Sequence, residues 1–400
     1  MSKTKKIIVL TLIGIVCIAG LYFAWKVVFG TPIEDVSIDN TKINTLPGGS
    51  ENIVTNTNNG DVPEGAGSEN TEGSPSEIQG DTLPILEKLS DQEIGYFWVN
   101  KKTNEIFYTN SDGDVYLAKT EDDQKISPQA VGTIYALLPN QTGEKILASF
   151  GEKNNLQTGI FNVVDKTWKP LSSDLVSVVW GGSEKKLFGI VKNSGKKDLV
   201  EINIEKAQPT YKTLLKDFVL NDVFLSVVPT DRILFSERSS SFYPSRVWEF
   251  NQKDQSLSLV VQTERGGTPG FSKDKKNIFF SIPSKKQLGF ITNSLKTTTY
   301  VDFFTIPDKC DLFASTTYCF VPQEQNDYIG FFDSYQQRKI FTTDTLMKFN
   351  LSTKEIGVLS ASAAITYKTD ATGVMFFENY IYFKNRFDNT LYRIDISKEI

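Results

Sequence analysis

The residues best suited to recognise a ligand lie in two loop-like segments. The first, residues 236–248 (SERSSSFYPSRVW), places Tyr243 between Arg238 and Arg246 in a chain that has only seven arginines. Two guanidinium groups beside an aromatic ring can hold the carboxylate of a peptide or of an anionic sugar. The alternative is an ordinary hairpin loop with no ligand, and the sequence leaves both interpretations open.

The second segment is longer and richer in polar aromatic residues. It covers residues 326–344 (NDYIGFFDSYQQRKIFTTD). Long loops on a rigid scaffold are where binding residues concentrate, so this segment supplies further candidate contacts. The alternative is a loop that packs on a neighbouring part of the fold. The candidate contact residues are Tyr328, Asp333, Tyr335 and Arg338.

Composition excludes several catalytic and metal-binding classes. The chain of 400 residues has no histidine and three cysteines. It therefore lacks Ser-His-Asp and Cys-His catalysis, His-ligated zinc and cysteine-rich zinc modules. The segment NSDGD at 110–114 starts like a calcium loop, but its glycine is misplaced and the closing Glu is missing. We expect no catalytic residue, no metal and no cofactor.

The body of the chain after Leu83 has the pattern of short β-strands. Runs rich in Phe, Tyr, Ile and Val alternate with polar turns, and the only helix-like window is LPILEKLSDQE at 83–93. Residues 83–400 carry 38 basic and 38 acidic side chains. Because binding to a phosphate backbone needs a basic surface, this neutral body argues against a nucleic-acid partner.

A repeat becomes visible when the turns are aligned. The start of a second strand recurs at intervals of 40, 41, 46, 45, 40 and 63 residues, and five of these match one four-stranded propeller blade. The pattern predicts an all-β fold, a β-propeller of seven blades of four antiparallel strands, with six or eight blades possible. The N-terminal unit is expected to complete or abut the closing blade. The markers are Ile106, Ile146, Leu187, Ile233, Ile278, Tyr318 and Ile381.

A single blade is not stable alone, because both faces of its sheet are apolar. A single four-stranded sheet cannot cover both of its apolar faces, whereas packing blades around an axis buries them and leaves only short sheet edges. The last interval is about twenty residues longer than the others. We therefore expect the 326–344 segment to be a long loop on the sixth blade.

Several turns resemble those of a known group of propellers. The segments SKDKKNIFF and GSEKKLFGI resemble the Ser-x-Asp-Gly-Lys turn of TolB-like, WD-repeat-like propellers, over residues 93–400. The Gly-Lys pair is missing from most copies and is approached most closely by TGEKI at 142–146. The resemblance implies a bacterial binding or scaffolding propeller and supplies no catalytic residue.

Two cysteines flank a predicted hairpin of the sixth blade. Cys310 and Cys319 have eight residues between them. In an oxidising compartment we expect a disulfide between the first two strands of this blade, which would stabilise the fold by about 2 kcal/mol. Two buried free thiols are the alternative, and either role is structural.

The N-terminus predicts a membrane anchor. Ile7–Trp25 holds 19 residues without a charge, and as a helix it spans about 28 Å, the thickness of a bilayer core. The preceding Lys3, Lys5 and Lys6 place the N-terminus in the cytoplasm. A cleaved signal peptide is the alternative, and Cys17 lies inside the apolar run.

The predicted domains follow from these segments. Residues 1–6 form a cytoplasmic stub, 7–29 a transmembrane signal-anchor helix, 30–82 a disordered acidic linker and 83–400 the propeller. Residues 31–82 carry ten acids and one lysine, with no aromatic residue. Such a segment cannot bury enough apolar surface to fold, and it acts as a tether with a span of roughly 40 Å.

The combined prediction is a single-pass, membrane-anchored extracytoplasmic propeller that binds or scaffolds a partner at the cell envelope. Its partners are the lipid bilayer, through the helix, and an envelope protein, a peptide or a polysaccharide. One alternative is a carboxylate-based glycan hydrolase or lyase, which needs two or three acids about 5–10 Å apart in the central channel. The other alternative is a structural spacer of the envelope.

Overall fold

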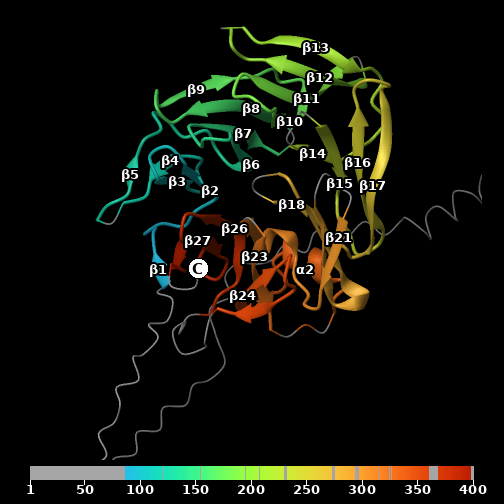
Figure 1. Cartoon of the computed structure of the whole chain (residues 1–400). Coiled ribbons are helices and arrows are strands. Elements are labelled where there is room, and N and C mark those ends of the chain that lie inside the picture. The colour runs from blue at the N-terminus through green and yellow to red at the C-terminus, as the bar shows by residue number, and fades with distance from the viewer. Residues whose placement is uncertain are drawn as a thin grey trace, which may run out of the picture. The chain divides into compact units, whose positions relative to one another are not determined.

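Seven small β-sheets are arranged as a ring in the computed structural model of the chain (Figure 1). The described residues are 86–119, 121–153, 155–193, 195–206, 208–228, 232–272, 275–292, 297–313, 315–323, 325, 327–359 and 368–397. The predicted anchor at 7–29 and linker at 30–82 lie outside them. Within these ranges, no helix is both long and apolar enough to cross a bilayer.

Each sheet has four antiparallel strands, which confirms the predicted all-β propeller of seven blades. Blade 1 holds β2 (Phe97–Asn100), β3 (Glu105–Thr109), β4 (Val115–Leu117) and β5 (Gln124–Lys125). Blade 2 holds β6 (Ile134–Pro139), β7 (Lys145–Glu152), β8 (Asn155–Asn162) and β9 (Thr167–Pro170). Blade 3 holds β10 (Leu175–Trp180), β11 (Lys186–Asn193), β12 (Lys196–Asn203) and β13 (Thr210–Leu215). Blade 4 holds β14 (Val223–Val228), β15 (Arg232–Glu237), β16 (Pro244–Asn251) and β17 (Ser256–Arg265).

The remaining three blades follow in chain order. Blade 5 holds β18 (Pro269–Phe271), β19 (Ile278–Ile282), β20 (Gln287–Thr292) and β21 (Thr297–Val301). Blade 6 holds β22 (Cys310–Phe313), β23 (Thr316–Pro322), β24 (Asp344–Asn350) and β25 (Ile356–Val358). Blade 7 holds β26 (Ala371–Phe377), β27 (Tyr380–Asn385), β28 (Leu391–Asp395) and β1 (Leu86–Lys88). The short helices are η1 (Pro283–Lys285), η2 (Pro307–Lys309) and α2 (Phe331–Gln336).

The ring closes by combining strands from the two ends of the described chain. Strand β1 pairs antiparallel with β28, with Leu86 opposite Ile394. This strand corrects the expectation of a helix-like segment at 83–93. An isolated helix of that length is marginal, whereas the free edge of β28 offers a ladder of hydrogen bonds and a place to bury Leu86. The unit that follows, β2–β5, abuts the closing blade instead of completing it.

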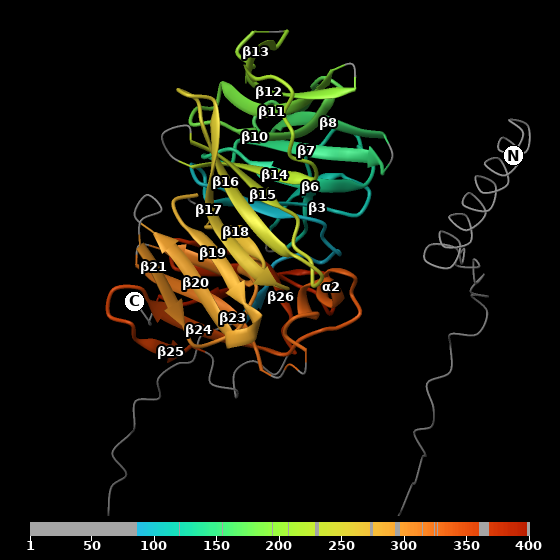
Figure 2. The ribbon, with the colours of Figure 1, turned by 90° about the vertical axis from the view of Figure 1, so that its right-hand side faces the viewer.

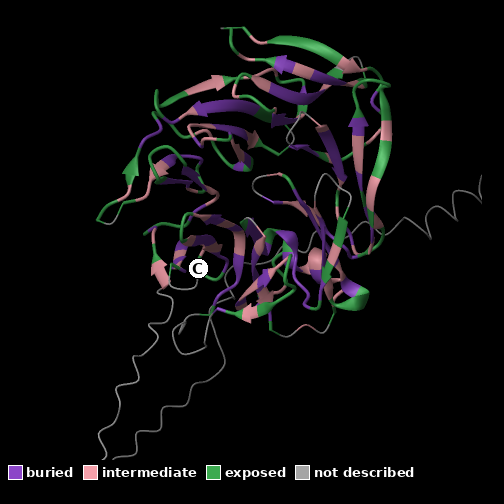
Figure 3. Ribbon diagram, in the orientation of Figure 1, coloured by how far each residue is buried: buried purple, intermediate pink, exposed green. Residues whose placement is uncertain are grey.

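The core is divided among the seven blade-to-blade contacts. Successive side chains of a strand point to opposite sheet faces, so a second strand serves two neighbours. In β19, Ile278 and Phe280 pack against blade 4, while Phe279 packs against blade 6. Tyr382 of blade 7 and Tyr108 of blade 1 belong to the cluster that closes the ring. Figure 3 shows that the buried residues concentrate along the inner strands, whereas the outermost strands are largely exposed.

The two ends of the ring differ in which connections they carry. Because neighbouring strands are antiparallel, loops between second and third strands share one face with the connections between blades. We call this the upper face; the loops that join the first and second strands, and the third and fourth, form the lower face. Helix α2 lies between β23 and β24 and therefore belongs to the upper face (Figure 2).

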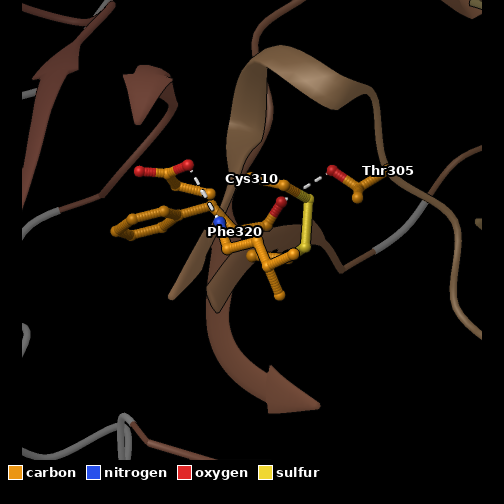
Figure 4. Close-up of a disulfide and its surroundings, with 6 residues drawn as sticks. Thr305, Cys310 and Phe320 are labelled. Atoms are coloured by element: carbon orange, nitrogen blue, oxygen red, sulfur yellow. Dashed lines mark hydrogen bonds between the residues drawn. A yellow bond between two sulfur atoms is a disulfide. The ribbon is translucent and has the colours of Figure 1, made fainter. Parts of the chain in front are cut away.

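A disulfide joins the first two strands of blade 6. Cys310 and Cys319 stand opposite each other in the pairing of β22 with β23, with 4.2 Å between their Cα atoms. Next to them, the hydroxyl of Thr305 donates a hydrogen bond to the carbonyl oxygen of Phe320 at 2.8 Å (Figure 4). Both cysteines are buried in the cluster between blades 5 and 6, so their role is structural.

Candidate functional site

The insertion of blade 6, residues 323–343, folds onto the upper face. Its helix α2 buries Phe331 and Tyr335 against Phe304 and Ile306 from the connection between blades 5 and 6. The ring of Tyr328 contacts Phe304 edge to face at 5.0 Å. The apolar spacing of FFDSY thus gives the insertion a small core of its own, which holds it against the propeller.

The two loop segments selected from the sequence meet on this face. The backbone N–H of Ser241, in the blade 4 loop, donates to Oδ2 of Asp333 in α2 at 2.9 Å, and the Ser241 hydroxyl donates to the same oxygen. Close by, Gly266 has φ of 74°, and a Cβ there would lie 2.2 Å from the carbonyl oxygen of Ile329. Only glycine allows the insertion to approach blade 4 this closely.

Several predicted contact residues serve packing. Tyr335 is buried, its hydroxyl donates to Asp370 at 3.1 Å, and the Arg386 guanidinium stacks 3.6 Å from its ring centre. Tyr328 packs on Phe304 and carries the Lys286 ammonium 4.9 Å above its ring. These tyrosines therefore hold the insertion in place, which is the packing role left open by the sequence.

In the blade 4 loop, each arginine has its own acid. Arg238 pairs with Asp222 at 2.9 Å, and Arg246 lies 3.7 Å from Glu237. Tyr243 is exposed between them in the chain. The carboxylates of Asp222 and Glu237 therefore already occupy part of the position that an anionic ligand of these two arginines would take.

Arg338 is the predicted residue that faces the channel most openly. It directly follows α2 with φ of 56°, its side chain is exposed, and it lines the channel mouth. Its guanidinium donates to Oδ1 of Asn389 in the neighbouring loop of blade 7. The insertion thus places the guanidinium of Arg338 at the channel mouth.

A buried ion network supports this side of the upper face, and sequence reasoning missed it. Lys309 is fully buried, and its ammonium lies 2.6 Å from Asp344 and 2.7 Å from Asp370. Asp370 also pairs with Arg386 at 2.9 Å. These residues are far apart in the sequence, so the network cannot be predicted from a local sequence pattern.

Protonation in this network follows from burial and charge pairing. Burial by itself would lower the pKa of Lys309, but the nearby carboxylates of Asp344 and Asp370 outweigh it and hold this pKa above its ordinary value. Burial raises the pKa of the Asp344 carboxyl although Lys309 opposes the shift. The network locks blades 6 and 7 to α2 through Tyr335.

A cavity of about 1080 Å³ occupies the centre of the ring. The first strands of the blades, among them β2, β6, β10, β14 and β26, form its wall. Most of its charged lining residues are basic. Those described are Lys101, Lys275, Lys276, Arg338, Lys384 and Arg386, with Asp308 as the one acid among them.

Two channel lysines have weakened proton affinity. Burial lowers the pKa of Lys275 to about 8. Burial, together with the nearby positive charge of Arg338 and Arg386, lowers the pKa of Lys384 to about 8, and Glu93 only partly opposes this. In the free protein, the surrounding negative charge does not offset the cost of burying either ammonium group. An anionic ligand would supply that charge and stabilise the protonated form of both lysines.

The described wall residues hold one carboxylate, whereas a glycosidase mechanism uses two. Asp308 is the sole acid among the described lining residues, and its Oδ2 accepts hydrogen bonds from Thr372 and from the backbone of Gly373. Among the residues that the structure describes, no cluster of three or more Cys, Asp or Glu side chains is arranged to hold a metal ion.

Exposed apolar side chains gather toward the upper face. The described part of the chain exposes 17 large apolar side chains. Ten lie in upper-face loops or at the upper ends of strands, five in outermost strands, and two, Val164 and Phe313, at the lower face. The ten are Tyr135, Leu156, Val176, Val219, Phe224, Phe242, Tyr243, Ile329, Phe341 and Phe387.

Comparisons with known proteins support the fold. No protein-family model and no curated protein matches the sequence. Among solved structures, the chain is similar to the tricorn protease, with a TM-score of 0.51 and 11% identity over 80% of this chain and 35% of that one. It is also similar to the β-propeller domain of Cps50 (Swd1) from Myceliophteria thermophila, with a TM-score of 0.50 and 7% identity over 78% of this chain and 100% of that one.

At these identities the similarity shows the fold and nothing finer. It supports a β-propeller fold for the chain. The chain spans 35% of the tricorn protease chain, so no activity is transferred from that protein. The narrower resemblance to TolB-like propellers stays a prediction.

Proposed function

We propose that this protein is a binding module that holds a protein or peptide partner on its upper face. The observation that carries the proposal is the concentration of exposed aromatic residues and arginines on that face. Phe242 is 78% exposed beside Tyr243, and Phe341 and Phe387 stack on each other with ring centres 5.4 Å apart while both remain exposed. Aromatic residues and arginine are enriched in protein interfaces and provide most of their energetic anchors.

The support beneath these side chains fits the same role. The insertion that carries Phe341 is fixed by the core of α2, by Asp333 on Ser241 and by the buried charges around Lys309. A rigid surface loses less conformational entropy on binding than a mobile one. The upper face therefore combines exposed anchors with a fixed geometry.

The test compares the two faces of the full-length chain. A photo-crosslinking amino acid replaces Phe242 or Phe341 on the upper face, and Val164 on the lower face serves as the matched control. We expect one crosslinked species from the upper-face positions and none from Val164. After the partner is identified, Phe341→Ser with Phe387→Ser is expected to weaken its binding by about tenfold, as for interface anchors. Equal crosslinking from both faces contradicts the proposal, and loop substitutions without any effect favour a structural spacer.

We also propose that the module is anchored in the cell membrane and faces the outside. The uncharged run Ile7–Trp25 and the lysines before it support this location. Ile13→Arg with Ile15→Arg is expected to release the protein from carbonate-washed membranes, because two charges at the helix centre oppose insertion. The intact chain should stay in the membrane and be digested by protease added outside the cells. Retention of the double variant, or protection of the propeller, overturns this location.

A further inference from the structure

We propose that the central channel is a binding site for an acidic peptide segment, held by Lys384 and Arg338 near the upper mouth and by Lys275 at the lower one. This inference deepens the proposed function, because the segment would belong to the partner docked on the upper face. It assigns the channel a ligand chemistry, which the exposed aromatic residues outside it do not specify.

The first argument is the separation of charge. The propeller sequence, residues 83–400, is neutral with 38 basic and 38 acidic side chains. The described channel lining nevertheless has six cations and one acid. A wall of this sign in a low-dielectric channel attracts and concentrates anions.

The second argument is the setting of Lys384. Its ammonium lies 3.5 Å from the carbonyl oxygen of Gly95, and the charged groups around it are Arg338, Arg386 and Glu93. Arg386 is already paired with Asp370. Lys384 and Arg338 therefore present two cations at one mouth. The described acids there are Glu93 and Asp308, and Asp308 already accepts hydrogen bonds from Thr372 and Gly373.

The third argument is the turn that carries Lys275. This residue joins β18 to β19 at the lower face, has φ of 59° and donates its backbone N–H to the carbonyl of Ser272 at 2.8 Å. Its side chain lines the channel, and no described carboxylate lies within ion-pair distance of its ammonium. The turn thus directs a poorly solvated cation into the cavity.

The fourth argument is the volume of the cavity and the position of its wall strands at the edges of their sheets. At about 1080 Å³ the cavity is at the upper limit of the volume that holds a drug-sized ligand, about 300–1,000 Å³. Strands β2, β6, β10 and β14 are edge strands of their sheets, so their channel-side backbone groups lack a neighbouring strand. An extended peptide can satisfy such groups while its carboxylates meet the cations.

The wall fits a sugar polymer less well. Sugars stack on open indole or phenol faces, but Trp98 and Trp180 are buried, with their ring N–H groups bonded to the carbonyls of Gly143 and Leu138. Phe224, which is exposed, has the Arg238 guanidinium 5.6 Å from its ring centre. The observations therefore favour a polypeptide over an anionic glycan.

The test measures binding of a fluorescent octaglutamate peptide to the full-length protein at pH 7 and low salt. The same peptide made of glutamine and an anionic polysaccharide, polygalacturonate, are the comparison probes. We expect octaglutamate alone to bind. Lys384→Gln or Lys275→Gln should each weaken binding by about tenfold, the value of one charge-assisted hydrogen bond. The matched control is Lys253→Gln, an exposed lysine in the turn between β16 and β17, which should leave binding unchanged.

The pH dependence gives a second readout. The pKa values of Lys275 and Lys384 are about 8 in the free protein, so both lose charge between pH 7 and pH 9.5. Binding should weaken over this interval in the wild type, and the Lys275→Gln, Lys384→Gln double variant should lose this dependence. Near pH 8, calorimetry in two buffers should show proton uptake on binding, because a bound carboxylate raises both pKa values.

Three results of these experiments overturn the inference. Equal binding of the glutamine peptide, unchanged binding by both lysine variants, or preference for polygalacturonate removes the acidic-peptide site. The chain's own acidic residues at 30–82 are a second source of the same chemistry. If octaglutamate binds only after those acids are replaced by amides, residues 30–82 occupy the channel. The inference that the channel binds a segment of the partner is then wrong. Loss of partner crosslinking at Phe242 with intact octaglutamate binding would instead contradict only the proposed function.

Discussion

The two faces of the propeller are built from the same seven blades, but the chain turns differently at each. No connection at the lower face exceeds six residues, and left-handed residues such as Asn104, Lys166 and Gln255 close its hairpins. The upper face carries the 21 residues between β23 and β24 and ten of the exposed large apolar side chains.

This difference shows how a repetitive fold acquires a specific surface. Tight hairpins are fixed by the twist and spacing of the strands, so the lower turns have little freedom to form a site. A long upper loop has that freedom, but it needs support of its own. Here Lys309, Asp344 and Asp370 supply the support from beneath.

The largest expected effect comes from breaking that support. Lys309→Met leaves the Asp344 carboxylate buried without its cation and leaves Asp370 with Arg386 alone, which should lower the free energy of unfolding by about 3–5 kcal/mol. Urea denaturation measures the change. Lys101→Met, an exposed lysine at the lower channel mouth, is the control and should change stability by less than about 0.5 kcal/mol. A loss below about 1 kcal/mol for Lys309→Met would show that the network is not needed.

The disulfide of blade 6 gives the next effect. Replacing Cys310 and Cys319 by serine should lower the free energy of unfolding by about 2 kcal/mol, because the short loop between them is no longer closed in the unfolded chain. Adding a reductant to the wild type should reproduce this loss and should not change the double variant further. A reductant that destabilises both proteins equally would rule out the bond as the cause.

The contact between the two upper-face loops predicts a local effect. Asp333→Ala removes the acceptor for both hydrogen bonds from Ser241 and should cost about 1–2 kcal/mol. Amide hydrogen exchange should rise in the blade 6 insertion and stay constant in lower-face turns. Ser241→Ala in the same background should add little, since both changes break one contact. Additive effects would mean that the two side chains act separately.

The two channel lysines predict a pH dependence of stability. The pKa values of Lys275 and Lys384 lie near 8 in the folded state and near the ordinary 10.5 when unfolded. Between these values the unfolded chain binds more protons, so the contribution of these lysines to stability rises with pH from about 8 to 10.5. The cost of burying their charge is complete below pH 8.

The measurement is chemical denaturation across that pH interval. Lys384→Met should flatten the rise, whereas Lys253→Met, on the outside of blade 4, should follow the wild type. A rise of the same slope in all three proteins would place its origin in other groups.

The blade count could be predicted because its signal is local. From Ile106 in β3 to Ile381 in β27, all seven repeat markers lie in the second strand of a blade. That strand is covered on both faces, so its apolar run is visible in any single unit. The segment around Leu86 could not be predicted from local sequence. Its pattern resembles a helix, but it forms a strand because it pairs with β28.

The candidate site was predicted only in part. Length and composition selected the blade 4 and blade 6 loops, and the structure brings both to one face through Ser241 and Asp333. The division between Tyr335, which is buried, and Arg338, which is exposed at the channel, could not be predicted because it depends on how α2 packs. Lys384 and Lys275 gave no signal, since each is one lysine among 36 in the chain.

The sequence by itself determined the class of fold, the number of repeats and the position of the long insertion, because these follow from periodic apolar residues and from loop length. The tertiary structure alone decided which face collects the aromatic residues, which lysines line the channel and how Lys309 finds two carboxylates. Those features join residues from different blades, and Coulomb and packing forces between them depend on distances that only ring closure sets.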